Sequence, residues 1–173
     1  MDDQKLALPC AIGSALWRGN PAALSVLSMQ RWLWVTQPQF WEQLHGGGLD
    51  DGVEVNWTCD RTSRRGDVAL LYRAEVAKDI AHLFRVDDDE LWEDVHPVDS
   101  KRRAWYCNAT LVYTLHHPLP LPVLRAEPRL QSWPALDLNM HALAFEIDPP
   151  TWRVLLELAH PRDRIELRKH SRA

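Results

Sequence analysis

A ten-residue alternation of apolar and polar side chains restricts the fold of this chain more than any other segment does. Between residues 106 and 115 one face is apolar and the other is polar, which is typical of a half-buried β-strand. The apolar face carries Cys107, Ala109, Leu111, Tyr113 and Leu115. Pro118, Pro120 and Pro122 follow, and proline has no N–H to donate. We therefore expect the strand to end at His116 and the proline segment to run extended and unpaired.

Other apolar runs predict further strands at residues 29–35, 68–72, 80–86 and 143–147. Thr36 and Pro38 begin a predicted helix, and Asp148 caps a second one. The apolar faces of the two helices are formed by Phe40, Trp41 and Leu44 and by Trp152, Leu155, Leu156 and Ala159. Successive strands without crossover helices predict an α+β fold, with a curved, mainly antiparallel sheet or small β-barrel and flanking helices.

The length suits a single domain. We expect an N-terminal extension at residues 1–28, a folded domain at 29–160 and a basic, poorly ordered tail at 161–173. The extension lacks clear periodicity, and Met29, directly before the first strand, is a candidate natural start. The alternative is an amphipathic leader that packs loosely on the domain.

Charge and cysteine content exclude several classes of protein. A net charge of −4 argues against a generally basic nucleic-acid-binding surface, although local basic patches are present. Three cysteines without a CxxC spacing argue against a disulfide framework and favour a reducing compartment. We find no apolar stretch of membrane-spanning length and no secretory signal, so we expect a cytoplasmic protein with no membrane partner.

Motifs of catalysis and metal binding are absent from the sequence. It contains no GxSxG, P-loop or GxGxxG motif. His116 and His117 are adjacent on a predicted strand, so they point to opposite faces and cannot easily bind one ion together. Nothing near Cys59 would activate its thiol. We therefore expect a non-enzymatic protein with no metal and no cofactor.

Nine tryptophans in 173 residues raise the question of what these flat rings contact. Helix faces and strand cores account for most of them. Trp57 differs, because the segment Asn56-Trp57-Thr58-Cys59 directly precedes a turn that carries Arg61, Arg64 and Arg65. Contact with a flat ligand and ordinary packing are both open for Trp57.

This segment and its surroundings resemble the EVE family of PUA-like domains, which is related to the YTH readers of methylated RNA. The resemblance spans about residues 30–158. It rests on four segments in order: Trp32-Leu33-Trp34-Val35, Asn56 to Cys59, Gly66-Asp67 before a strand that ends in Tyr72, and Asn139-Met140 before the closing strand. YTH domains have a comparable Trp-Cys-Ser/Thr segment, whereas here Thr58 stands between Trp57 and Cys59.

The resemblance implies a PUA-like β-barrel that takes a modified, flipped-out base into an aromatic cage. The base would be, for example, methylated or hydroxymethylated, in DNA or RNA, with DNA favoured. Trp57 matches the cage position, and Thr36 and Gln37 match a place where such domains present polar groups to the base edge. The other ligand-binding candidates are Trp34, Tyr72 and Trp105 as walls, Thr58 and Asn139 as hydrogen-bonding groups, Cys59 as an apolar contact, and Arg73. Arg61, Arg64 and Arg65, with Arg73, are expected to hold flanking phosphates, which position a strand without reading its sequence.

Two other functions remain open. The related ASCH domains suggest a small-molecule or nucleotide-binding enzyme, which should combine a Lys, a Glu or Asp and a Tyr or Thr in one pocket. A protein-interaction module would instead present its tryptophans on a flat surface patch.

Overall fold

The computed structural model describes residues 29–37, 52–96, 99–137 and 142–172. Its strands are β1 (Arg31–Thr36), β2 (Glu54–Cys59), β3 (Val68–Arg73), β4 (Asp79–Val86), β5 (Trp92–Val95), β6 (Arg103–Pro120) and β7 (Ala144–Glu146). Its helices are α2 (Leu121–Ala126), the 3-10 turn η2 (Pro128–Leu130), α3 (Pro134–Asp137), α4 (Pro149–Leu158) and α5 (Pro161–His170). The predicted helix after Thr36 and the extension at 1–28 lie outside the described residues. None of the described helices is long and apolar enough to cross a membrane.

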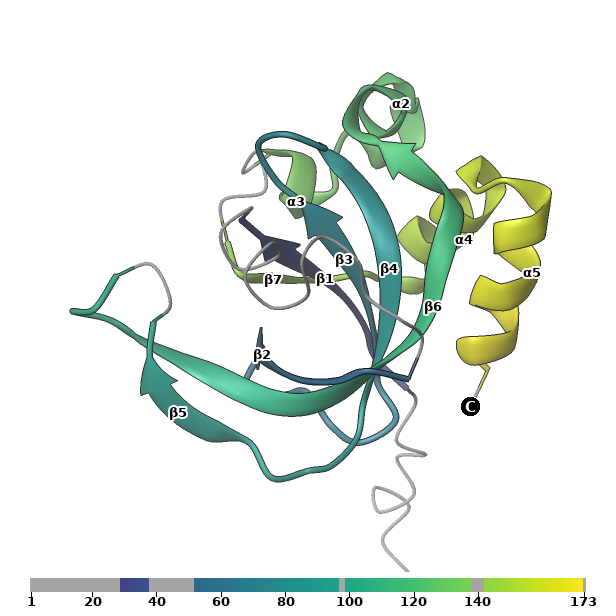
Figure 1. Cartoon of the computed structure of the whole chain (residues 1–173). Coiled ribbons are helices and arrows are strands. Elements are labelled where there is room, and N and C mark those ends of the chain that lie inside the picture. Colours follow the sequence, from purple (N-terminus) through teal and green to yellow (C-terminus); the bar gives the residue numbers. More distant parts are fainter. Residues whose placement is uncertain (1–28, 38–51, 97–98, 138–141, 173) are drawn as a thin grey trace, which may run out of the picture.

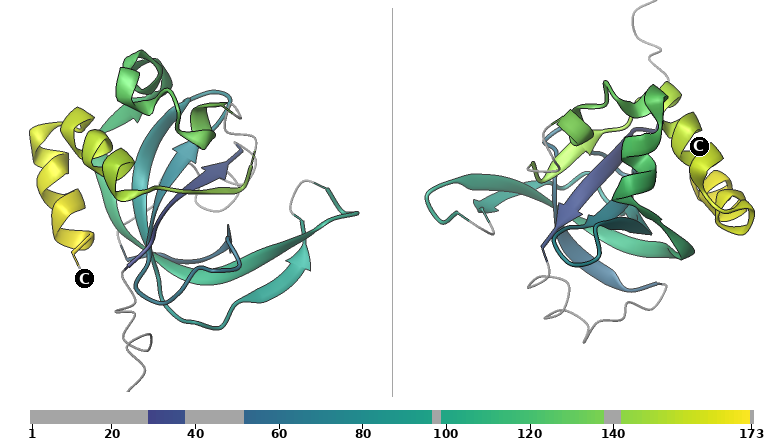
Figure 2. Two further views of the ribbon diagram at one scale, coloured as in Figure 1. Left: turned by 180° about the vertical axis from the view of Figure 1, so that it is seen from behind. Right: turned by 90° about the horizontal axis from the view of Figure 1, so that it is seen from above.

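The strands form one seven-stranded sheet in the order β2-β6-β4-β3-β1-β7, with β5 paired to β6 as well. Only the β1–β3 pair is parallel among the described pairs. The eighteen-residue β6 pairs with β4 on one side and with β2 and β5 on the other. Its curvature rolls the sheet into a half-barrel, with α4 and α5 on the outside (Figures 1 and 2). The predicted α+β fold with a curved, mainly antiparallel sheet is confirmed.

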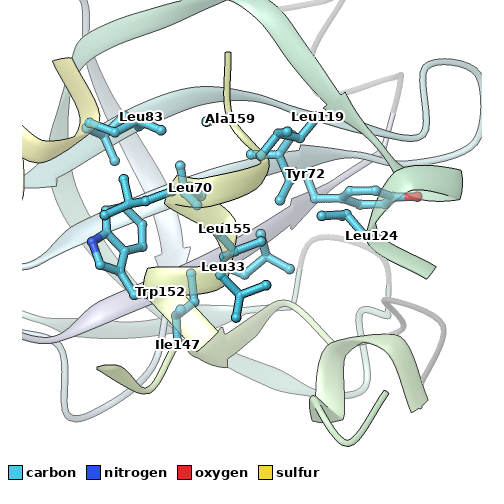
Figure 3. Packing of buried hydrophobic residues seen from close by; sticks show 14 of the residues in the cluster. Leu33, Leu70, Tyr72, Leu83, Leu119, Leu124, Ile147, Trp152, Leu155 and Ala159 are labelled. Carbon is cyan, nitrogen blue, oxygen red and sulfur yellow. The ribbon is translucent and has the colours of Figure 1, made fainter. Parts of the chain in front are cut away.

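The outer face of the sheet packs against the helices. Leu33, Leu70 and Leu83 from the strands meet Leu124 of α2 and Leu155 of α4, and each is at most 1% exposed (Figure 3). Burying each such side chain contributes roughly 1.5–3 kcal/mol. This outer core therefore fixes the helices to the convex side of the half-barrel.

The inner face is covered by the curl of the sheet itself. Because successive strand residues point to opposite faces, Trp32 and Trp34 lie on the inner side while Leu33 lies on the outer side. We call the inner set the interior cluster: Trp32, Trp34, Val55, Trp57, Cys59, Ala69, Leu71, Phe84, Val86, Cys107, Ala109 and Leu111. Alternate residues of β2 enter this cluster, so β2 closes over the other strands.

The prediction that the central strand ends at His116 is wrong. β6 continues to Pro120, with Leu119 opposite Ile80 and Pro120 opposite Asp79. The register with β4 shifts between Ile80 and His82, so a bulge accommodates the extra residues. Beyond residue 111 the described backbone pairing of β6 with other strands is with β4 alone. A proline nitrogen that faces the other side therefore costs no hydrogen bond between strands.

Helix α4 is the helix predicted after Asp148. The Asp148 side chain accepts a hydrogen bond from the Thr151 N–H at 2.7 Å, and Pro149 and Pro150 occupy the first turn. Trp152, Leu155, Leu156 and Ala159 are all buried. The predicted cap and the predicted apolar face of this helix are therefore confirmed.

The expected disorder of the basic tail is wrong for residues 161–170, which form α5. Two side chains of this charged helix are buried, Leu167 and Asp163. The Asp163 carboxylate accepts hydrogen bonds from the Tyr113 hydroxyl at 2.7 Å and from the N–H groups of His116 and His117 at 3.0 Å each. Burial alone raises the pKa of Asp163, but these hydrogen bonds outweigh it and hold the pKa below its ordinary value. An ionised carboxylate thus docks α5 on β6.

Candidate functional site

Three aromatic rings form the centre of the interior cluster. The Trp57 ring lies 6.4 Å from the Trp34 ring and 6.1 Å from the Phe84 ring, with interplanar angles of 17° and 22°. These centroid separations fall in the range of about 4.5–7 Å that is favoured by offset-stacked rings. Trp57 is 6% exposed and Trp34 is fully buried. The structure therefore shows Trp57 in packing contact with one of its predicted companions.

Two polar atoms of this aromatic centre lack partners. The indole Nε1 atoms of Trp34 and Trp57 are buried and have no hydrogen-bond partner among the described residues. Leaving a buried donor unsatisfied costs about 1–3 kcal/mol, so most buried N–H groups in proteins are paired. A ligand that offers acceptor atoms inside the half-barrel would remove this cost.

Cys59 and Cys107 line the interior beside Trp57, and both are free thiols. In the pairing of β2 with β6, Cys107 lies opposite Trp57 and Trp105 lies opposite Cys59. A hydrogen bond with the Cys59 thiol and burial raise the pKa of Cys107 strongly. A neutral, buried thiol is an apolar packing group rather than a nucleophile.

Trp105 stands at the rim of the half-barrel. It is 37% exposed and belongs to the same face of β6 as Cys107, since the two residues are two apart on the strand. On the other face of this part of β6, Tyr106 stacks on Trp92 of β5 at 6.0 Å. The two strands form a ribbon that projects from the body of the domain (Figure 1). Trp105 thus offers an accessible ring next to the end of β2.

The arginine-rich turn after β2 is held by the buried carboxylate of Asp67. Asp67 accepts hydrogen bonds from the Gln30 N–H at 2.8 Å, the Arg64 N–H at 2.9 Å and the Trp32 indole N–H at 3.2 Å. Gly66 has φ +88°, a conformation that favours glycine, and so lets the chain turn into β3. Asp67 therefore ties the turn directly to a tryptophan of the interior cluster.

A cleft of about 1040 Å³ lies beside this turn, between the start of β3 and the end of α5. Its cationic lining residues are Arg64, Arg65, Arg85, Lys169 and Arg172. Its acidic ones are Asp67, Asp89 and Glu146. Asp67 and Asp89 accept hydrogen bonds from the backbone N–H groups of Arg64 and Arg65, and the five arginine and lysine side chains of the lining outnumber its three carboxylates. The cleft is a basic surface on a chain whose net charge is negative.

Several predicted site residues lie elsewhere. Tyr72 belongs to the outer core, and because Val35 is its partner on β1, it faces away from Trp34. One cage cannot be lined by both Trp34 and Tyr72. Arg73 forms an ion pair with Asp79 at 2.7 Å, at the opposite end of β3 from Asp67.

The polar candidates are also spread out. Thr36 is buried at the end of β1, next to the half-buried Gln37. Thr58 is buried on the strand face opposite to Trp57. Asn139 lies outside the described residues. Arg61, Arg64 and Arg65 are exposed, as their predicted role requires.

Sequence reasoning missed four residues of these two surfaces. Phe84 belongs to the interior cluster, and its position in the apolar run at 80–86 was the available signal. Arg85, Lys169 and Arg172 join the basic cleft from β4 and from the end of α5. Lys169 and Arg172 belong to the basic run at 161–173, but their place beside Arg64, like that of Arg85, follows only from the tertiary fold.

A family model described as EVE domain matches residues 30–158 of the chain. No curated protein matches the chain in sequence.

Several solved structures share the fold. Rpa0253 from Rhodopseudomonas palustris is 21% identical, with a TM-score of 0.55, over 76% of this chain and 93% of that one. A hypothetical protein from Leishmania major is 16% identical, with a TM-score of 0.55, over 81% and 97%. The human THYN1 protein, solved in complex with 5-methylcytosine containing DNA, is 12% identical, with a TM-score of 0.54, over 75% and 96%. At these identities the likeness establishes a common fold.

Proposed function

The chain belongs to the EVE domain family, and from this premise we propose that it is a non-catalytic module that binds nucleic acid carrying a modified base. The base enters the half-barrel beside Trp57, and the strand lies along the arginine-rich turn. The proposal draws support from human THYN1, whose fold is similar and which was solved with 5-methylcytosine containing DNA.

The observation that carries the proposal is the pair of indole N–H groups of Trp34 and Trp57, which have no hydrogen-bond partner within the described ranges of the chain. Nucleobases carry ring-nitrogen and carbonyl acceptors along their edges. An acceptor of this kind would satisfy donors that otherwise cost about 1–3 kcal/mol each. A flat ligand with several acceptor atoms therefore matches the donors of the aromatic interior.

Stacking energies explain why the site must also recognise the modification. Stacking a base on an aromatic ring contributes about 1–3 kcal/mol, and extruding a base from a duplex costs a few kcal/mol. These two quantities nearly cancel. Selective binding then requires hydrogen bonds to the base edge and an apolar fit around the added group. The indole donors supply the first, and the buried side chains of Cys59 and Cys107 supply apolar surface for the second.

Exposed cations next to this interior would hold the phosphates on either side of the base. Arg61, Arg64 and Arg65 follow β2, and the fold of their turn is fixed by Asp67. The basic cleft extends this surface towards Arg85 and the end of α5. Such contacts make affinity fall steeply with salt concentration without adding sequence preference.

The test compares affinities for oligonucleotides that differ only in one modified base: 5-methylcytosine, 5-hydroxymethylcytosine, N6-methyladenine or none. Fluorescence anisotropy with the full chain measures Kd at fixed salt. Trp57→Phe keeps an aromatic ring and removes the indole donor, while Trp105→Ala removes the exposed rim ring. Trp92→Ala is the matched control, because Trp92 stacks on the other face of the same ribbon.

We expect one modified oligonucleotide to bind more tightly than the unmodified one. Trp57→Phe should weaken that complex about fivefold, the equivalent of one hydrogen bond of about 1 kcal/mol. Trp105→Ala should weaken it about 5- to 150-fold, and Trp92→Ala should leave Kd unchanged. Equal affinity for all oligonucleotides would refute the proposal, as would equal effects of the Trp105 and Trp92 substitutions.

A further inference from the structure

A second cluster of reactive side chains lies on the opposite side of the sheet from the interior cluster, where α5 begins. It consists of His117 on β6, His160 directly before α5 and Asp163 in the first turn of α5. One ligand atom from each of the three residues lies within 4.8 Å of the other two. These residues are far apart in the sequence from the Trp57 segment and have no role in the proposed base site.

Asp163 is the rigid member of the cluster. Its side chain is fully buried and is held by the Tyr113 hydroxyl and by two backbone N–H groups of β6. Its Oδ2 atom faces the His117 Nδ1 atom at 3.3 Å. Metal-binding carboxylates and histidines are typically oriented by such hydrogen bonds, so the carboxylate is preorganised.

The two histidines are the accessible members. The His117 side chain is 55% exposed, and its ring stacks on the His160 ring at 3.8 Å between centroids. The His160 Nδ1 atom accepts only a long hydrogen bond of 3.4 Å from the Arg162 N–H. Metal binding through Nε2 would shift the ring proton to Nδ1 and give up this weak contact. Two exposed imidazoles beside a buried carboxylate form an accessible N,N,O donor set.

We propose that His117, His160 and Asp163 form a binding site for a divalent transition-metal ion of the zinc type. Two nitrogen ligands and one oxygen ligand are a common set for zinc, and a fourth position would be left for water. Bond lengths of about 2.0–2.2 Å place the ligand atoms of a tetrahedral zinc site about 3.4 Å apart. Rotation of the exposed imidazole rings closes the present separations to that value and ends their parallel stacking.

His116 does not belong to the site. Adjacent strand residues point apart, and His116 packs edge-on against the Tyr113 ring at 6.2 Å. The second imidazole comes instead from His160, forty-three positions further along the chain. Of the two adjacent histidines, His117 faces the proposed site and His116 contacts the Tyr113 ring. His116 is therefore a matched control for His117.

An ion bound here would connect α5 to β6 through a second kind of contact. The helix is otherwise docked through Leu167 and Asp163, while its far end carries Lys169 and Arg172 to the basic cleft. Metal binding to the folded state alone raises stability in proportion to the logarithm of metal concentration.

The experiment titrates the chelator-treated full chain with zinc against a chromophoric competitor, and with cobalt(II) while recording visible absorption. The variants are His117→Ala, His160→Ala and the control His116→Ala. All three remove exposed side chains, and circular dichroism checks that each variant is folded. Thermal unfolding with and without zinc provides a second readout.

We expect one ion per chain, absorption bands of nitrogen- and oxygen-ligated cobalt, and a zinc-dependent rise in Tm. His117→Ala and His160→Ala should each weaken zinc binding tenfold or more and abolish the Tm shift, whereas His116→Ala should bind like the unchanged protein. Absence of stoichiometric binding would overturn the proposal. Equal loss in the His116 variant, or binding that survives both other substitutions, would overturn it as well.

Discussion

Replacing Asp67 should show how strongly the interior cluster and the arginine-rich turn depend on one carboxylate. Asp67 is 3% exposed and accepts three hydrogen bonds, from Gln30, Arg64 and Trp32. In Asp67→Ala these three donors lose their acceptor at once. In Asp67→Asn the remaining carbonyl oxygen can serve only one side of the former carboxylate, and the amide NH₂ faces a donor on the other side.

The expected cost follows from how each donor is placed. The indole N–H of Trp32 is buried, so leaving it unsatisfied costs about 1–3 kcal/mol. The N–H groups of Gln30 and Arg64 are only partly buried and border the cleft, so water can replace the carboxylate there at a net loss of about 1 kcal/mol each. We therefore expect Asp67→Ala to lower the free energy of unfolding by about 3–5 kcal/mol, and Asp67→Asn by about 2 kcal/mol.

Urea unfolding followed by far-ultraviolet circular dichroism measures these values, and Trp32→Phe completes a double-mutant cycle. Because Trp32→Phe removes the buried donor, Asp67→Ala should cost about 1–3 kcal/mol less in that background. A loss below 1 kcal/mol for Asp67→Ala would refute the reasoning. Strict additivity of the two changes would show that the indole hydrogen bond contributes nothing.

Two further predictions concern the cores. Burial, and secondarily the charge of Arg73, lowers the pKa of His82 to about 4, whereas a histidine in the unfolded chain titrates near 6.5. The free energy of unfolding should therefore keep its full value above pH 6.5 and fall by about 3 kcal/mol as the pH drops towards 4. His82→Gln should flatten this decline in urea unfolding at a series of pH values, whereas removal of an exposed ring in His116→Gln should preserve it, and an unchanged slope for His82→Gln would contradict the assignment. Leu155→Ala should cost about 2–5 kcal/mol in the same assay because it leaves a cavity between α4 and the sheet, whereas the partly exposed Val123→Ala should change stability by about 0.5 kcal/mol or less. Equal costs for these two substitutions would show that the outer core does not depend on close packing.

Five of the seven described strands and the helix capped by Asp148 were predictable because their signals are local, whereas β2 and β5 were not predicted as strands. Alternation at 106–115 identified the central strand, and Asp148 with two prolines identified the start of α4. The predictions for the end of β6 and for residues 161–170 were wrong because contacts with distant segments outweigh the local sequence preference there. Pro118 and Pro120 lie within β6 because this end of β6 pairs on one side only, and α5 is ordered because β6 supplies donors to Asp163.

The candidate site was predictable only in part. The sequence analysis named Trp34 as a candidate wall beside Trp57, and the structure stacks the two rings. It also grouped Tyr72 with them, although the register of β1 with β3 places Tyr72 on the other face. Register is a property of two paired strands, so it cannot be deduced from the positions of aromatic residues in the sequence.

The sequence by itself determined the family, the α+β class and the apolar face of the central strand, because side-chain periodicity and motif order are properties of consecutive residues. Only the tertiary structure decided which face closes into a half-barrel, that Trp57 is buried against Trp34 and Phe84, and that cations from β4 and α5 join the arginine-rich turn. It also decided that His117 meets His160 and Asp163. The physical reason is the same in each case: curvature, register and helix docking bring together groups that no sequence spacing relates.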